Sequence, residues 1–318
     1  MLPIRRNSRR RNGESVDESE RLPEINVDER HFPSSLFGHQ FAMDTTQDYN
    51  FQQLLRNFNS LELYCDAPHE SFYASTPNCC IDVPIEEALQ FPQKVSNRLP
   101  VEIGSMSRHL TLRNLKHSWC RHASHYFEWV SGVPELRMMD MRERIKLVAR
   151  QTPKIGFLMM SYWTFQKRCG ISVKPHENQD ELYEIVGDPV TTITTFIHTH
   201  IISTFRRINL TRGEYLLLKA VALFEALDQY FPPADRFIVD TALNKYRSAL
   251  VSCMRRSHPE LEDGALLERV QALLGTLTYL EVVRESDNRH MADVVLRNGG
   301  GMRGRLAIEI HMHSNRMD

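Results

Sequence analysis

The sequence lacks the cysteine spacing of a zinc finger, because no two of its six cysteines form a C-x2-C pair. Such scattered thiols fit reduced intracellular cysteines better than a disulfide framework. No apolar run approaches the roughly 20 residues that a membrane-spanning helix needs. The N-terminal stretch MLPIRRNSRRR has no apolar core, so it does not have the form of a secretory signal. These absences argue against a zinc-finger protein, a secreted protein and a membrane protein.

Motifs of catalysis and phosphate binding are also missing. No Ser-His-Asp or Cys-His set occurs at a usable spacing, and the glycines at 299–301 lack the Lys-Ser/Thr of a phosphate-binding loop. His198 and His200 have no acidic or cysteine partner nearby, so we interpret them as core or surface histidines. We therefore expect neither an enzyme nor a metal or cofactor. The net charge of −1 argues neither for nor against a nucleic-acid surface.

The chain has enough apolar sequence for one large domain with a tail. Of its 318 residues, 42% are hydrophobic and 25% are charged, as in ordinary globular proteins. Residues 1–44 are poor in apolar side chains, and we predict that they are disordered. Residues 45–318 are predicted to form the folded domain. The tail carries a basic cluster that is a nuclear-import signal, a phosphate-contacting arm or a solvated stretch without a specific role: Arg5, Arg6, Arg9, Arg10 and Arg11.

Apolar spacing predicts two helices in the first half of the domain. Residues 51–63 have their leucines and phenylalanines at helical spacing. Five prolines mark 64–104 as a long loop, with a short helical turn at 85–89. A second, longer helix is predicted from 111 to 133, where Pro134 ends it.

The next stretch is predicted to lie in the middle of the core. A helix begins near Met141, and Pro153 is expected to kink or break it. The run GFLMMSYWTF that follows has almost no polar face, which is typical of a buried helix. Residues 169–186 are predicted to be a short hairpin or an exposed loop. Residues 189–205 are assigned to a helix, although their β-branched side chains favour a strand.

Three helix starts are predicted in the second half of the domain. Thr211 and Glu214 have the spacing of a capping box. Asp235 is predicted to cap the next helix. Asp263 starts a long helix that extends to 283 or as far as 296. Glycines then interrupt the chain before a last short segment, RLAIEIHM. Strands and helices do not alternate, so the fold class is all-α.

Four segments, in this order, resemble parts of nuclear-receptor ligand-binding domains, most closely the divergent nematode receptors. The first, from Glu128-Trp129 to Val133-Pro134, resembles the end of the family's third helix. The second and third, LTRGEYLLLKAVALF and ALNKYRSAL, are similar to its eighth and ninth helices. The fourth, 306–311, resembles its activation helix. The resemblance implies a three-layer antiparallel helical sandwich with at most a short β-hairpin.

The resemblance also implies a receptor that regulates transcription through a small lipophilic ligand. In this family the ligand occupies an underfilled end of the sandwich. Its occupancy changes where the short terminal helix docks, and the docked helix completes a surface for a leucine-rich coregulator helix. Candidate residues of the ligand pocket come from three predicted helices: Leu115, Trp119, His122, Tyr126, Phe157, Met160, Ser161 and His290.

The coregulator surface implied by the resemblance ends at an acidic residue. Glu309 would face the N-terminal N–H groups of the bound helix, where negative charge is favoured. The lysine that the family usually has late in its third helix is Ser131 in this sequence, and His311 stands at a usually apolar position. The candidate residues of the coregulator surface are Val130, Val133, Ile145, Val148, Arg150 and Glu309.

The resemblance further implies a nuclear location and a homodimer or a heterodimer with another nuclear receptor. This sequence has no counterpart of the family's two-finger DNA-binding domain, so we expect no direct DNA contact through it. A second interpretation stays open: a ligand-independent helical interaction module that heterodimerises with full receptors or titrates coregulators. Charged or bulky side chains that fill the predicted pocket would favour this second interpretation.

Overall fold

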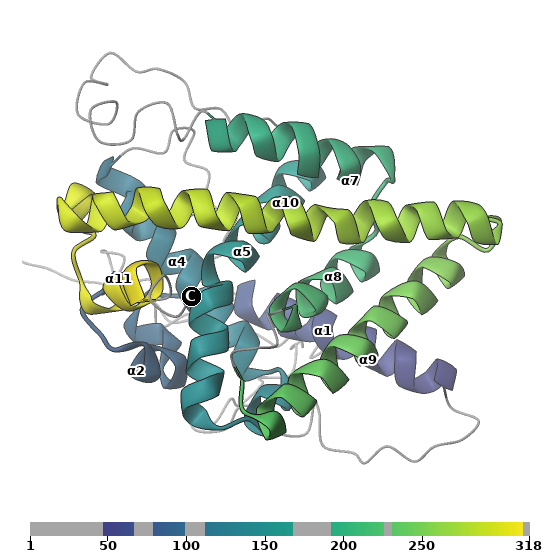
Figure 1. Ribbon diagram of the computed structural model, residues 1–318, viewed down its shortest axis with the longest axis horizontal. Helices are drawn as coiled ribbons and strands as arrows, with labels where there is room; N and C mark the ends of the chain where they lie inside the picture. Colours follow the sequence, from purple (N-terminus) through teal and green to yellow (C-terminus); the bar gives the residue numbers. More distant parts are fainter. Residues whose placement is uncertain (1–46, 67–78, 99–111, 168–191, 226–230, 314–318) are drawn as a thin grey trace, which may run out of the picture. The chain divides into compact units, whose positions relative to one another are not determined.

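The described part of the chain is helical (Figure 1). Its β pairing is limited to an isolated antiparallel bridge between Cys79 and Ser96, which confirms the all-α fold class. No helix within these described ranges is both long and apolar enough to cross a membrane. The predicted hairpin at 169–186 and the tail lie outside the described residues. The computed structural model describes residues 47–66, 79–98, 112–167, 192–225 and 231–313.

The first helices surround the long helix predicted to end at Pro134. This helix is α4 (Leu112–Ser131), and η4 (Pro134–Arg137) follows it. Helix α1 (Gln47–Asp66) packs against α4 and α8. Between them in sequence lie the short α2 (Ile85–Gln90) and η3 (Pro92–Lys94), which also contact α4. Helix α2 confirms the helical turn predicted within the long loop.

Helix α5 (Met141–Lys167) lies at the centre of the fold. It contacts α4, α8 and α10, and the apolar run GFLMMSYWTF supplies buried residues such as Leu158 and Tyr162, as predicted. Pro153 lies inside α5 without ending it, so the predicted break does not occur. Packing of both flanking halves against other helices offsets the hydrogen bond that the proline cannot donate.

The β-branched stretch that begins at residue 192 is helical, as predicted. Residues 192–207 form continuous helix that includes η5 (Ile197–Ile202) and α7 (Ser203–Arg207). Ile201 and Phe205 are fully buried and face α5 and α10. Tertiary packing therefore overrides the strand preference of these residues.

Helix α8 (Arg212–Phe224) begins with the predicted capping box. The Thr211 hydroxyl accepts from the Glu214 N–H, and the Glu214 carboxylate accepts from the Thr211 N–H. Helix α9 (Pro233–Ser257) packs along α8. The prediction that Asp235 caps α9 was wrong, because the N-cap is Pro232 and Asp235 lies in the first turn. Its carboxylate instead accepts from the Asp140 N–H and ties α9 to the start of α5.

Helix α10 (Asp263–Leu296) is one continuous helix, drawn yellow-green in Figure 1, and it confirms the longer of the two predicted extents. It contacts α5, α8 and α9, so α5 and α8 have helices on more than one side, as expected of the inner layer. After η7 (Gly299–Gly301), the chain folds back onto α10 as α11 (Arg305–Ile308) and η8 (Glu309–His313).

Candidate ligand and coregulator site

The terminal segment, α11 with η8, is docked by apolar contacts. Leu306, Ala307 and Ile310 are fully buried. Ala307 belongs to a core cluster with residues of α10, and Leu115 and Trp119 of α4 pack against the same cluster. Burial of side chains of this size stabilises the docked position by roughly 1.5–3 kcal/mol for each large residue. The segment that resembles an activation helix therefore bridges α4 and α10.

A buried polar chain fixes the same segment. The Trp119 Nε1–H donates to His311 Nε2 over 2.9 Å, and His311 Nδ1 lies 3.0 Å from the Asn288 Oδ1. Because indole only donates, His311 Nε2 accepts, and Nδ1 carries the proton that it donates to Asn288. The polar residue at a usually apolar position thus holds the terminal segment to α4 and α10 at once.

His311 makes the docked state sensitive to acid. Burial lowers the pKa of His311 to about 3, against about 6.5 for a histidine in an unfolded chain. The neutral ring therefore contributes stability that is complete above about pH 6.5 and is lost as the pH falls towards its folded pKa. Going from about pH 7 to about pH 5, we expect the wild type to lose about 2 kcal/mol more unfolding free energy than His311→Gln. Urea unfolding at both pH values measures the difference, and equal losses in the two proteins would contradict this role.

The carboxylate of Glu309 is held by two groups. Its Oε2 accepts from the Ile85 N–H at 2.7 Å, and its Oε1 accepts from the Arg305 Nε at 2.8 Å. One turn earlier, the Leu306 N–H donates to the Ile81 carbonyl. A Cβ on Gly304 would lie 2.7 Å from that carbonyl oxygen, so the close approach of the two segments requires glycine there. Glu309, expected to face the N-terminus of a coregulator helix, thus accepts from the first N–H of α2 in its own chain.

The predicted pocket residues of α4 and α5 fall into two groups. Leu115 and Trp119 lie against the terminal segment. His122 lies beside Trp163 of α5, with 6.4 Å between the ring centroids. Tyr126 and Ser161 are fully buried and their hydroxyls donate to backbone carbonyls of α5, those of Val148 and Phe157.

The remaining predicted pocket residues are less enclosed. Phe157 and Met160 on α5 are half-buried, as is His290 on α10. Burial lowers the pKa of His290, against the opposing charge of Asp293. Asn288, one half-turn earlier on α10, is the residue of this helix that holds His311, and no local pattern in the sequence points to it.

Two buried polar atoms in this region have no hydrogen-bond partner among the described residues: His122 Nε2 and Asn288 Nδ2. The other nitrogen of His122 lies 2.7 Å from the Ser118 carbonyl oxygen, which fixes the ring. Burial lowers the pKa of His122 to about 4, so its ring is neutral near pH 7. The His122 Nε2 can therefore accept one hydrogen bond from a bound molecule, and the Asn288 Nδ2 can donate one to it.

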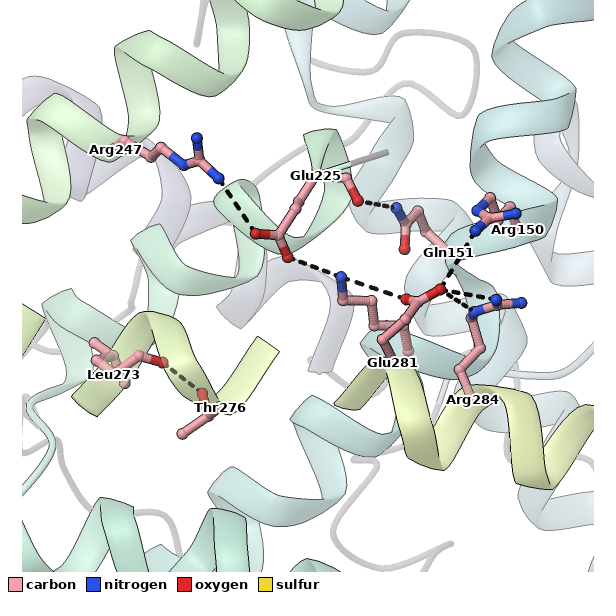
Figure 2. A network of polar contacts seen from close by, with 9 residues as sticks. Arg150, Gln151, Glu225, Arg247, Leu273, Thr276, Glu281 and Arg284 are labelled. Carbon is pink, nitrogen blue, oxygen red and sulfur yellow. Dashed lines mark hydrogen bonds and ion pairs between the residues drawn. The ribbon is translucent and has the colours of Figure 1, made fainter. Parts of the chain in front are cut away.

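The predicted coregulator residues lie in two different environments. Val130, Val133 and Val148 are buried and Ile145 is half-buried, near the junction of α4 and α5. Arg150 instead donates to Glu281 of α10 at 3.3 Å. Figure 2 shows Arg150 in a network of polar contacts with Glu225, Arg247, Glu281 and Arg284. Lys154 of α5 connects Glu225, at the end of α8, to Glu281 of α10.

This network ties the inner helices together. Lys154 is almost fully buried and lies 3.0 Å from Glu225 and 3.6 Å from Glu281. Burial alone would raise the pKa of Glu281, but Lys154 and Arg284 outweigh it and hold the pKa below its ordinary value. The structure thus gives Arg150 a bond to α10, while Glu309 bonds to Ile85 and Arg305.

Ser131, which stands where the family usually has a lysine, has Arg137 as a basic neighbour. The Ser131 hydroxyl donates to the Glu128 carbonyl, as is common at helix ends. Arg137 of η4 is exposed, and its Nη2 donates to the Ser131 carbonyl at 3.0 Å. A positive charge is therefore present at the C-terminal end of α4, from a residue that lies six positions later in the sequence than the expected lysine.

No cluster of three metal-ligating side chains occurs within the described ranges. His200 packs its ring against Phe196 and Tyr279, at centroid distances of 4.4 and 4.8 Å. Burial lowers the pKa of His198, which favours its neutral form.

Comparison with known proteins gives one family. The chain is 24% identical over 209 residues to "Nuclear hormone receptor family member nhr-4" of Caenorhabditis elegans, covering 63% of this chain and 41% of that protein. It is 23% identical over 244 residues to family member nhr-100 of the same organism, covering 73% of this chain and 55% of that protein. The chain therefore spans about half the length of these curated relatives. Residues 103–292 match the family described as "Ligand-binding domain of nuclear hormone receptor". This match covers more than half of the chain, and the described fold is helical. The chain therefore belongs to the nuclear hormone receptor family.

Proposed function

We propose that this domain is a receptor that regulates transcription in the nucleus, without enzymatic activity, and that a small lipophilic ligand controls its terminal segment. The observation that carries the proposal is the Trp119–His311 hydrogen bond. Trp119 belongs to the predicted pocket and also holds the terminal segment. A ligand that moves the Trp119 ring would therefore change the free energy of docking, which is how one site biases another.

The residues of the predicted pocket favour a mainly apolar ligand with one or two polar groups. Leu115, Phe157 and Met160 supply apolar surface from α4 and α5. Because the Ser118 carbonyl only accepts, Nδ1 of the neutral His122 ring carries the proton, and its Nε2 can accept one hydrogen bond from a ligand. The Asn288 Nδ2 can donate one. A ligand hydroxyl would satisfy either atom and a carbonyl would satisfy Asn288, whereas leaving such an atom unbonded costs about 1–3 kcal/mol.

The whole chain, purified from cells, is tested for a bound ligand. We expect native mass spectra to show a bound small molecule that organic extraction removes, and the melting temperature to fall with it, because a ligand of the native state stabilises it. Met160→Trp should block ligand binding, because the larger side chain would fill part of the predicted pocket. Met138→Trp is the matched control, since Met138 is 63% exposed. Unextracted protein without a bound molecule, and with an unchanged melting temperature, would contradict the ligand proposal.

The coregulator part of the proposal rests on charges at two ends of one surface. Glu309 would face the N-terminus of the bound coregulator helix, and Arg137 would face its C-terminus. Arg137→Ala should weaken binding of a short amphipathic peptide with leucines at i, i+3 and i+4. Arg142→Ala, on the exposed start of α5, serves as the matched control for loss of charge.

An interaction module without ligand is a second candidate, favoured by the outer face of α10. Leu267, Val282 and Leu296 are each about half exposed or more, at 57%, 49% and 59%. Such apolar side chains on one long helix suit a homodimer or a heterodimer with another nuclear receptor. Sedimentation of the wild type and Val282→Glu tests the homodimer: dimerisation lost in the variant supports this face, and unchanged association excludes it.

A further inference from the structure

Helix α2 covers the place where the coregulator surface is proposed. It contacts α4, α5 and α11, the three elements that form this surface (Figure 1). Ile85 and Ala88 are buried, at 7% and 0% exposure, while Glu86 and Gln90 point to solvent. One face of α2 is thus buried against the elements on which an external helix would dock.

The sequence of α2 has the pattern of a docking helix. Ile85, Ala88 and Leu89 stand at i, i+3 and i+4, the spacing by which an amphipathic helix presents one apolar face to a groove. The acidic Glu86 and Glu87 lie in its first turn. The first N–H of this helix, that of Ile85, donates to Glu309, the residue assigned to receive a coregulator helix.

The segment that carries α2 is attached to α4 on both sides. Before α2, the Cys79 Sγ lies 3.3 Å from the Lys116 carbonyl oxygen. After it, Arg98 makes a two-pronged contact with Glu128 near the end of α4, at 2.8 and 3.0 Å. These attachments hold α2 at a high effective concentration beside its docking place, which favours it over a free helix.

The terminal segment does not depend on α2 alone. Leu306, Ala307 and Ile310 are buried, and His311 is bonded to α4 and α10. Release of α2 would therefore leave α11 docked and uncover the surface beside it.

We propose that α2 is an internal occupant of the coregulator surface, so that an external coregulator helix binds only by displacing it. This inference rests on the proposed coregulator function. In this proposal α2 competes with the external helix for the same surface. Only molecules in which α2 is undocked can bind the external helix, so the apparent affinity is the intrinsic affinity multiplied by the undocked fraction.

The test replaces Ala88 by Glu, which puts a carboxylate at a fully buried position of α2. Gln90→Glu adds the same charge on the exposed side of the same helix and is the matched control. The probe is a fluorescent amphipathic peptide with leucines at i, i+3 and i+4, titrated into the whole chain. We expect A88E to bind it about tenfold or more tightly than the wild type, and Q90E to bind it like the wild type.

Each outcome decides the inference. Equal affinity of wild type and A88E would overturn it while leaving the coregulator surface in place. Failure of all three proteins to bind would overturn the coregulator function and the inference with it. Hydrogen exchange checks that A88E releases α2 but keeps α8 and α10 protected. If A88E does not fold, Ile85→Asn takes its place, because Ile85 lies at the edge of the buried face.

Discussion

Replacing Glu62 by Ala is expected to lower the free energy of unfolding by about 3–5 kcal/mol, because it leaves a buried ammonium without its counter-charge. Lys219 of α8 is 0% exposed, and its Nζ lies 2.9 Å from the Glu62 carboxylate of α1. The Tyr215 hydroxyl donates to the same carboxylate at 3.0 Å. Lys219 also lies over the Trp129 ring, 4.5 Å from its centroid, so one ion pair joins α1, α4 and α8.

The Glu62 pair also gives a pH dependence of known sign. Burial would raise the pKa of Glu62, but Lys219, His125 and the Tyr215 hydrogen bond together outweigh burial and hold this pKa below its ordinary value. Its contribution is therefore complete above the ordinary carboxyl pKa and is lost as the pH falls through the lowered value. Urea unfolding of Glu62→Ala near neutral pH measures the loss. The double variant Glu62→Met, Lys219→Met should recover most of it, and a loss below about 1 kcal/mol in the single variant would contradict the assignment.

The second large effect is expected from Arg269→Ala. Glu214, the capping-box residue of α8, is 0% exposed, and Arg269 of α10 contacts it at 2.7 and 2.8 Å in a two-pronged arrangement. Arg269 also donates to the Ile208 carbonyl. Removing the guanidinium leaves a buried carboxylate without its close counter-charge, with only the helix cap and His258 Nε2 at 3.8 Å beside it. This loss should cost about 3–5 kcal/mol of unfolding free energy.

A surface ion pair between α9 and α10 supplies the control for Arg269. Arg255 lies 2.6 Å from Asp263 at the start of α10, but both side chains are more than half exposed. Arg255→Ala should therefore change stability by less than about 1 kcal/mol. Losses of similar size in the two variants would show that the buried environment of Glu214 does not govern the effect.

Local signals in the sequence predicted most of the helices. The capping box at Thr211 and Glu214 is a local pattern, and the structure has both of its hydrogen bonds. The prediction for Asp235 failed because its carboxylate bonds to Asp140, a partner 95 positions away that no local pattern indicates. Pro153 likewise does not end α5, because packing on distant helices decides the outcome.

The site was predictable in part. Resemblance to the family assigns Trp119 to the predicted pocket and Glu309 to the coregulator surface, and it marks His311 as a polar residue at a usually apolar position. Its partner Asn288 and the contact of Glu309 with Ile85 join residues far apart in the chain. The apolar spacing of Ile85, Ala88 and Leu89 was a signal for α2 as a docking helix, but it acquires meaning only once α2 is seen against α4, α5 and α11.

The terminal segment is docked by buried contacts, and we propose that Trp119 couples it to the predicted ligand site. The test is hydrogen exchange of the whole chain, followed by mass spectrometry of peptides that cover 302–313. We expect slow exchange in the wild type and much faster exchange of this segment in Trp119→Phe, while α8 stays protected in both proteins. Rapid exchange of the segment in the wild type would show that it is not docked, and equal exchange in the two proteins would show that Trp119 does not hold it.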